Sequence, residues 1–171
     1  FLLRRKISVQ KIILPVDTVN TQFYRINWCA LTVQGGDMER HFDEELRTLY
    51  KDILKMGVMA QEAIYKSIEA LKNRDKQGAK EVIDTDDKID ELELAIDEKC
   101  IDLIARHQPM AGDLRFITTG MKINAELERI ADLALDISQR VLELVDKPIL
   151  KPLIDIPKLS VIAQNMVRDA I

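Results

Sequence analysis

Residues 46–71, LRTLYKDILKMGVMAQEAIYKSIEAL, decide the fold class of this chain. Apolar or small side chains recur there after three and then four residues, which places them on one face of an α-helix. The pattern starts near His41 and extends over roughly 30 residues, longer than an ordinary globular helix. It predicts an all-α protein. The positions that define the face are Leu46, Leu49, Ile53, Met56, Ala60, Ala63, Ser67 and Leu71.

Two further long helices follow the first. A break at residues 73–75 ends in an aspartate, a residue type that caps helix N-termini. The second helix is predicted over residues 76–107, because the residue before Pro109 disfavours helical backbone. The third is predicted over about residues 113–145. Long helices joined by short turns pack antiparallel, so we expect an antiparallel three-helix bundle.

The rest of the chain differs from this bundle. We expect residues 38–147 to form the bundle, and residues 148–171 to be a linker and the truncated start of a second bundle. Pro157 is expected to open that last helix at its first position. Residues 1–37 lack a sustained helical period, and two glycines stand near the end of this segment. We interpret them as an extension outside the native fold, with translation starting at Met38; a small strand-rich appendage is the alternative.

Composition excludes several classes of function. The chain has 171 residues, a net charge of −4, and only 5% aromatic residues. Its first 37 residues carry five Lys or Arg and two Asp, so the acidic excess lies in the bundle, which argues against nucleic acid as a ligand. Two cysteines give no disulfide framework, which favours the cytoplasm. No apolar run is long enough for a membrane span.

The third helix carries acids where apolar residues are expected. Glu128, Asp132 and Asp136 follow one another at intervals of four, so Asp132 lies roughly 40° and Asp136 roughly 80° around the helix from Glu128. On the same wheel Glu128 falls within an apolar stripe, and the two aspartates lie along one side of it. That stripe consists of Leu114, Ile117, Met121, Ala125 and Leu135.

The second helix repeats this feature. Asp86, Asp90, Glu93 and Asp97 share an arc with Ala79, Val82, Ile83, Cys100 and Ile104. If the hairpin between the second and third helices turns near Met110, Glu93 lies level with Glu128, and the pair Asp90 and Asp86 lies level with Asp132 and Asp136. At about 1.5 Å per residue these acids would form one patch about two turns tall.

Three interpretations of this patch are open. The acids could form a solvated face, with the stripe misplaced by one position. They could pair with Lys or Arg, although Arg129 points about 100° away from Glu128. They could hold hard cations, because a charge is costly to bury unless a cation compensates it. Oxygen ligands alone suit Mg²⁺, Mn²⁺, Ca²⁺ or iron rather than zinc. The candidate metal ligands are Glu128, Asp132, Asp86, Asp90, Glu93 and Asp136.

No motif for catalysis accompanies the acids. The sequence contains no glycine-rich phosphate loop, no H-E-x-x-H motif and no nucleophile–base arrangement. Its two histidines, His41 and His107, are remote from the acids, which argues against a zinc hydrolase or a ferritin-like di-iron centre. We therefore predict that the chain is not an enzyme. A carboxylate-bridged metalloenzyme remains an alternative, as does a helical scaffold that binds no metal.

From Met38 onward the sequence resembles the PhoU family of bacterial phosphate-transport regulators. The most specific match is Leu127-Glu128-Arg129-Ile130-Ala131-Asp132, which contains the family's E-x-x-x-D signature with Ala131 where the family usually has glycine. Further matches, in the family's order, are His41-Phe42-Asp43-Glu44-Glu45-Leu46, Met56-Gly57, Ala63-Ile64, Val82-Ile83, Gln108-Pro109, Asp113-Leu114-Arg115 and Lys122-Ile123.

The resemblance implies both a fold and a function. PhoU-like proteins consist of two similar three-helix bundles with acidic metal-binding motifs, so this chain would hold the first bundle and the opening of the second. Glu128 and Asp132 match the motif directly, and the spacing of Asp86 and Asp90 repeats it. The family implies a cytoplasmic, non-enzymatic regulator that binds metal, which we expect to be Fe, Mn or Mg. We also expect a homodimer, because the long helices would be exposed and half of the molecule would be missing. The regulator would restrain phosphate uptake and the phosphate-starvation response through the ATPase subunit of the phosphate ABC transporter and a phosphate-sensing histidine kinase.

Overall fold

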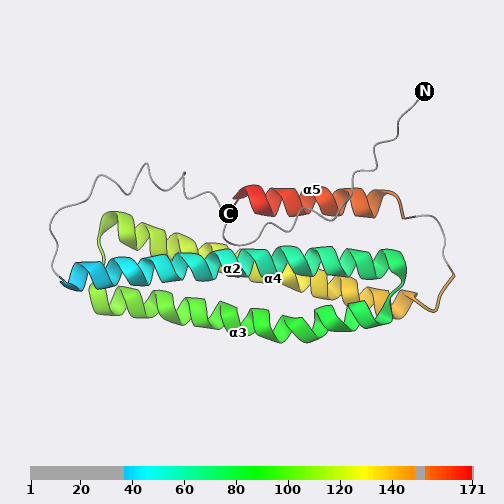
Figure 1. The fold of residues 1–171 in the computed structure, drawn as a ribbon, viewed down its shortest axis with the longest axis horizontal. Coiled ribbons are helices and arrows are strands. Elements are labelled where there is room, and N and C mark those ends of the chain that lie inside the picture. Colours follow the sequence, from blue (N-terminus) through cyan, green and yellow to red (C-terminus); the bar gives the residue numbers. More distant parts are fainter. Residues whose placement is uncertain (1–36, 149–152, 171) are drawn as a thin grey trace, which may run out of the picture. The chain divides into compact units, whose positions relative to one another are not determined.

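The described part of the chain is built of helices. A computed structural model describes residues 37–148 and 153–170, with side chains from His41 onward (Figure 1). The helices are α2 (Asp37–Asn73), α3 (Lys76–His107), α4 (Ala111–Leu144) and α5 (Asp155–Ala170). These residues contain no strand, which confirms the predicted all-α class. The interpretations of residues 1–37 concern a segment outside the described residues, apart from Asp37.

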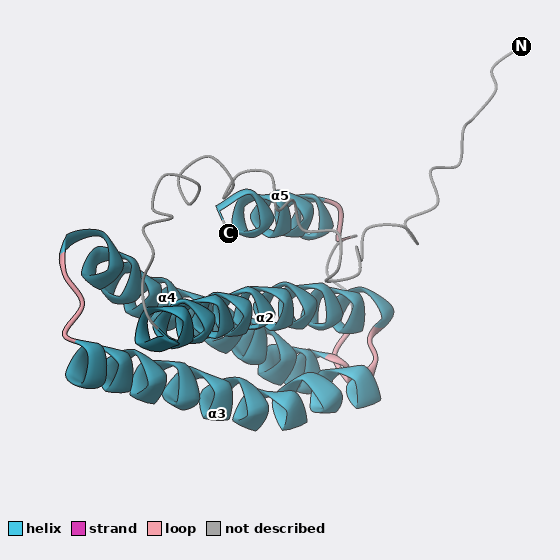
Figure 2. Ribbon diagram, turned by 60° about the vertical axis from the view of Figure 1, so that its left-hand side comes forward, coloured by secondary structure: helices cyan, strands magenta, loops and turns pink. Residues whose placement is uncertain are grey.

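The three long helices run antiparallel. The sequence colours in Figure 1 run in one direction along α2, return along α3 and reverse again along α4. Figure 2 shows the same three helices packed together from a second direction. The bundle belongs to a compact unit that begins at Met38. No helix in the described ranges has an apolar stretch long and uncharged enough to cross a bilayer.

The predicted boundary between α2 and α3 is confirmed in its details. Asp75 caps α3, because its Oδ1 accepts a hydrogen bond from the Gln77 backbone N–H at 2.9 Å. Arg74 has a positive φ of 56° in the turn before it. At the other end of α3, Gln108 adopts the left-handed conformation with φ 45°, and its N–H donates to the Ile104 carbonyl at 3.0 Å.

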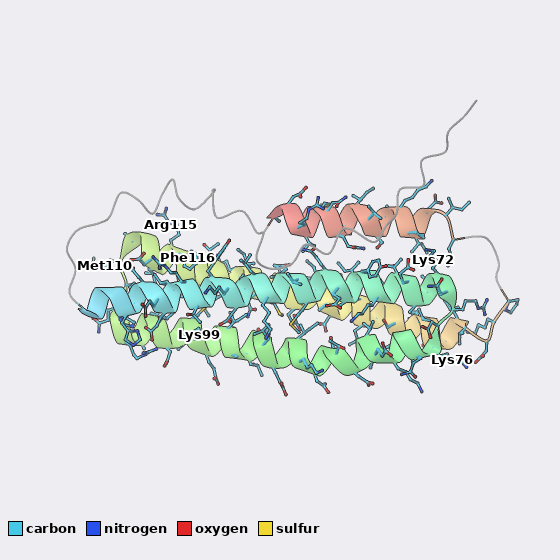
Figure 3. The ribbon with its side chains drawn as sticks, viewed as in Figure 1. Lys72, Lys76, Lys99, Met110, Arg115 and Phe116 are labelled. Atoms are coloured by element: carbon cyan, nitrogen blue, oxygen red, sulfur yellow. The ribbon has the colours of Figure 1, made fainter. Side chains whose placement is uncertain are left out.

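The turn between α2 and α3 also holds the end of α4. The Arg74 guanidinium donates hydrogen bonds to the carbonyls of Leu144, Val145 and Lys147. Lys76, labelled in Figure 3, forms an ion pair with Asp146 at 2.9 Å. The last carbonyls of a helix lack partners within the helix, so these contacts satisfy the C-terminus of α4.

The buried face of each helix follows the 3-4 spacing. On α2 the predicted positions from Leu46 to Ser67 are all buried. The buried residues of α4 are smaller and include one glycine, two alanines, one serine and one asparagine. A Cβ added to Gly120 would lie 2.9 Å from Ile53 Cδ1, so α2 and α4 approach closely at that level. The buried residues of α4 are Ile117, Gly120, Asn124, Leu127, Ala131, Ala134, Ser138 and Val141.

Two predicted boundaries were wrong by about two residues. The third helix begins at Ala111 rather than near Asp113, and ends at Leu144. The last helix begins at Asp155, so Pro157 is its third residue rather than its first. The first N–H groups of a helix have no partner within it, which allows proline throughout the first turn. Val167 of α5 packs against the core of the bundle.

Candidate functional site

The candidate acids of α3 occupy two kinds of position. Asp86 and Glu93 continue the 3-4 series of buried residues on α3 and are partly buried themselves. Asp90 lies beside them and is exposed. The other members of the series are apolar or small. Two carboxylates seven residues apart therefore interrupt the buried face of α3. The buried members of the series are Ala79, Val82, Ile89, Ile96, Cys100 and Leu103.

The candidate acids of α4 lie at the edge of its buried face. Glu128 is partly buried beside Leu127, whereas Asp132 and Asp136 are exposed. The prediction that Glu128 falls within the apolar stripe was therefore wrong, because the stripe was misplaced around α4. Leu114, a member of that stripe, is 38% exposed, and Ala125 is exposed. The buried face is centred near Leu127 and Ala131. The sequence pattern missed it because small and polar residues form much of this face, and they carry little weight in an apolar pattern.

Carboxylates of the two helices disfavour one another's charged forms across the interface. Burial, together with the negative charge of Asp132 and then of Asp90 and Glu93, raises the pKa of Glu128. Burial and the charges of Asp90 and Asp132 raise the pKa of Asp86. Each interaction disfavours the charged form. We call Asp86, Asp90, Glu93, Asp97, Glu128 and Asp132 the acidic strip.

Two candidate ligands remain, Glu93 and Asp136, and only Glu93 belongs to the acidic strip. Burial raises the pKa of Glu93, and the charge of Asp97 contributes more than that of Asp90, so Asp97 belongs to the strip. Asp136 lies a turn farther along α4, and its charge is not among those that raise the pKa of Asp86, Glu93 or Glu128. It interacts electrostatically with Arg140 instead. Electrostatic interactions therefore link five of the six candidate ligands, and Asp136 is not among them.

Among the described residues, no basic side chain neutralises the acidic strip. Within the described ranges, no Lys, Arg or His forms an ion pair within 4 Å of any of its six acids. The basic residues of the bundle pair with acids elsewhere, such as Lys99 with Asp52. The interpretation that the acids pair with Lys or Arg is therefore not supported by the described contacts.

A buried asparagine lies beneath the strip, and the sequence patterns did not single it out. Asn124 of α4 is 0% exposed. Its Nδ2 donates to the Glu93 carbonyl oxygen at 3.0 Å and to Asp97 Oδ1 at 3.2 Å. Its own Oδ1 is buried and has no hydrogen-bond partner among the described residues. The available signal was its place in a 3-4 series between Gly120 and Leu127, where an amide is unusual.

The donor chemistry of the strip fits a hard cation. Its side chains offer carboxylate oxygens, and the amide oxygen of Asn124 lies unpaired beside them. In the described ranges, no three or more His, Cys, Asp or Glu side chains are placed to hold one metal ion. Carboxylates that repel one another have no reason to converge without a cation, so binding would require new rotamers at the strip.

Comparisons with known proteins identify the family. A family model described as the PhoU domain matches residues 53–141, which is more than half of the chain. The chain belongs to the PhoU family. The match includes all of the strip and the E-x-x-x-D segment from Glu128 to Asp132, so the resemblance inferred from the sequence is confirmed.

Individual PhoU proteins agree with this assignment. The phosphate-specific transport system accessory protein PhoU homolog of Aquifex aeolicus is 43% identical over 128 residues, covering 75% of this chain and 58% of that protein. The crystal structure of PhoU from Pseudomonas aeruginosa matches with a TM-score of 0.72 at 32% identity, over 75% of this chain and 62% of that one. A phosphate transport system regulatory protein PhoU from Streptococcus pneumoniae matches with a TM-score of 0.68 at 30% identity, over 75% and 60%.

The chain spans somewhat more than half the length of these relatives. The names of these relatives describe accessory or regulatory proteins of phosphate transport.

Proposed function

We propose that this chain acts as a metal-binding helical adaptor that negatively controls phosphate uptake and the phosphate-starvation two-component response. Its partners would be the ATPase subunit of a phosphate ABC transporter and a phosphate-sensing histidine kinase, both met in the cytoplasm. The proposal includes a homodimer and no enzymatic step. Its main support is the acidic strip, which runs along the signature segment of the family and has no neutralising cation among the described residues.

The proposed ligands are Glu128, Asp132, Asp86, Asp90 and Glu93, with Asp97 added by the geometry. Fe, Mn²⁺ or Mg²⁺ would supply positive charge between α3 and α4, and these cations favour oxygen ligands. Without this positive charge, the carboxylates disfavour one another's charged forms, as the raised pKa values of Asp86, Glu93 and Glu128 indicate. Binding would then join two helices that repel each other at this level, and would make the outer surfaces of α3 and α4 more rigid for a partner.

Capture of the transporter's ATPase subunit tests the adaptor role. The purified full chain would be immobilised and exposed to the isolated ATPase subunit, once with EDTA and once with Mn²⁺. We expect retention with Mn²⁺ and at least a tenfold loss with EDTA or with the double variant Glu128→Gln, Asp132→Asn. The control is Glu126→Gln, an exposed acid on the opposite side of α4. Equal retention in all samples would exclude metal dependence.

A metal-independent scaffold is the second candidate. Its specific support is the exposure of Asp90 and Asp132, together with the lack of a preformed ligand group in the described ranges. It predicts that the ATPase subunit binds in EDTA as it does in Mn²⁺, and that purified chain contains no stoichiometric metal. Elemental analysis of the chain after desalting distinguishes the two candidates without reference to any partner.

A further inference from the structure

Asn124 is exceptional among the buried polar side chains. The described residues include four of these, and three are serines that hydrogen-bond within their own helix. Asn124 alone bonds to a different helix. A serine bonded to its own helix is satisfied wherever that helix packs, whereas Asn124 depends on the position of α3. The three internal bonds join Ser67 to Ile64, Ser138 to Ala134 and Gln164 to Ser160.

The hydrogen bonds of Asn124 fix the level of α4 against α3. Its Nδ2 contacts the Glu93 carbonyl and the Asp97 carboxylate, which lie one turn apart on α3. Asn124 itself lies one turn before Glu128 on α4. The two helices are antiparallel, and the Asn124 amide bonds to Asp97. Glu128, one turn later on α4, therefore lies level with Glu93, one turn earlier on α3. The charges of these two glutamates do interact.

One polar atom of Asn124 is buried without compensation. This atom is Oδ1, which has no partner among the described residues. A buried acceptor of this kind loses its hydrogen bonds to water and gains none in the protein, which destabilises the folded state. A leucine of similar volume would fill the interface without that loss. Buried polar residues retained in helix interfaces are best known for fixing register. The register fixed here is that of the acidic strip.

We infer that Asn124 is a positioning residue for the acidic strip. It holds the Asp97 carboxylate toward α4 and keeps Glu93 level with Glu128, so that carboxylates of both helices reach one cation. This inference rests on the proposed metal binding and adds a residue that lies outside the E-x-x-x-D signature. A side chain that orients a ligand by hydrogen bonding commonly contributes ten- to a hundredfold to metal affinity.

A titration with Mn²⁺, followed by its EPR signal, tests this inference on the full chain. The variants are Asn124→Leu, Asp97→Asn and the double variant, with Ser138→Ala as the matched control. Ser138 is buried on the same face of α4 but bonds only to its own helix. We expect Asn124→Leu and Asp97→Asn each to weaken Mn²⁺ binding about tenfold or more, and Ser138→Ala to leave it unchanged.

The double variant separates positioning from general damage to the fold. If Asn124 acts through Asp97, the double variant binds Mn²⁺ no more weakly than Asp97→Asn alone. Urea unfolding in EDTA should show Asn124→Leu at least as stable as the parent chain, which a merely structural role for the amide would not allow. Additive losses of affinity, or a destabilised Asn124→Leu, would overturn the inference.

The remaining outcomes are equally decisive. If the parent chain binds Mn²⁺ and Asn124→Leu binds it equally well, the inference is wrong and the proposed metal binding stands. If the parent chain binds no Mn²⁺, the proposed metal site fails and the inference fails with it. Should Asn124→Leu not fold, Asp97→Asn decides alone, because an affinity equal to that of the parent would exclude a role for the Asn124–Asp97 contact.

Discussion

Two clusters of carboxylates on the same bundle have opposite electrostatic surroundings. At the end where α2 begins and α3 ends, Glu45 accepts one hydrogen bond from Arg106 at 3.0 Å and contacts His107 Nε2 at 2.7 Å. Burial alone would raise the pKa of Glu45, but the hydrogen bonds to His107 and Arg106 outweigh it and lower the pKa. His107 also packs against Phe42, with ring centroids 4.6 Å apart.

The acidic strip lacks all of these partners. Glu128 has Asp132, Asp90 and Glu93 as its charged neighbours, and its pKa is raised. The bundle therefore neutralises Glu45 with basic side chains of another helix and leaves the acids of the strip with like charges as neighbours. A folding requirement explains the first cluster. It does not explain the second, and this contrast is the strongest reason to look for a ligand at the strip.

The largest expected effect comes from breaking the neutralised cluster. Replacing Glu45 by alanine leaves Arg106 and the partly buried His107 without their shared acceptor. Hydrogen bonds to charged groups contribute roughly 1.5–3 kcal/mol when buried, so we expect a loss of about 1–2 kcal/mol at this partly exposed site. Urea unfolding at pH 7 measures it. No loss would mean that the Glu45 contacts do not stabilise the bundle.

Neutralising the strip should have the opposite sign. The double variant Glu128→Gln, Asp132→Asn removes a like-charge pair one turn apart and its interactions with α3. Such pairs cost a few tenths of a kcal/mol each where solvent screens them, so the free energy of unfolding in EDTA should rise by about 0.5–1 kcal/mol. Destabilisation of the metal-free double variant would contradict the repulsion described here.

The two clusters should also respond oppositely to pH. The folded-state pKa of Glu128 is raised above its ordinary 4.5, so protonation favours the folded state, and this contribution is lost as pH rises through the raised value. The pKa of Glu45 is lowered, so its contribution is present above 4.5 and is lost as pH falls through the lowered value. The gain from neutralising the strip should therefore shrink to within about 0.3 kcal/mol near pH 4. Urea titrations from pH 4 to pH 7 measure this; a constant gain would refute it.

The smallest effect serves as the reference for the others. Glu126 lies on α4 but is exposed and points away from the strip. Glu126→Gln should change the free energy of unfolding by no more than about 0.5 kcal/mol, the usual range for surface substitutions. A gain as large as that of the strip variant would show that any acid removed from this acidic chain has the same effect.

The sequence predicted most of the fold because its strongest signals are local. The 3-4 series from Leu46 to Ser67, the cap at Asp75 and the proline at 109 each act through neighbouring residues. The buried face of α4 was misplaced because its members are often small or polar, and their burial depends on how closely α2 approaches Gly120.

The candidate site could be predicted only in part, for a related reason. Antiparallel levels were enough to place Glu93 near Glu128, whose charges interact. They matched Asp86 with Asp136, whereas it is the charge of Asp132 that acts on Asp86. They could not exclude Asp136, because its position relative to α3 depends on how far it lies around α4. Neither could they identify Asn124, since the partner of a buried amide is decided by the packing of another helix.

The most direct test of the account is a thermal melt of the full chain with EDTA and with Mn²⁺. A cation that binds only the folded state adds about 2.7 kcal/mol at a hundredfold excess over its Kd, which corresponds to about 5–10 °C for a chain of this size. We expect that rise in Tm, and its loss in the double variant Glu128→Gln, Asp132→Asn. A Tm unmoved by Mn²⁺, Mg²⁺ and iron alike would contradict it.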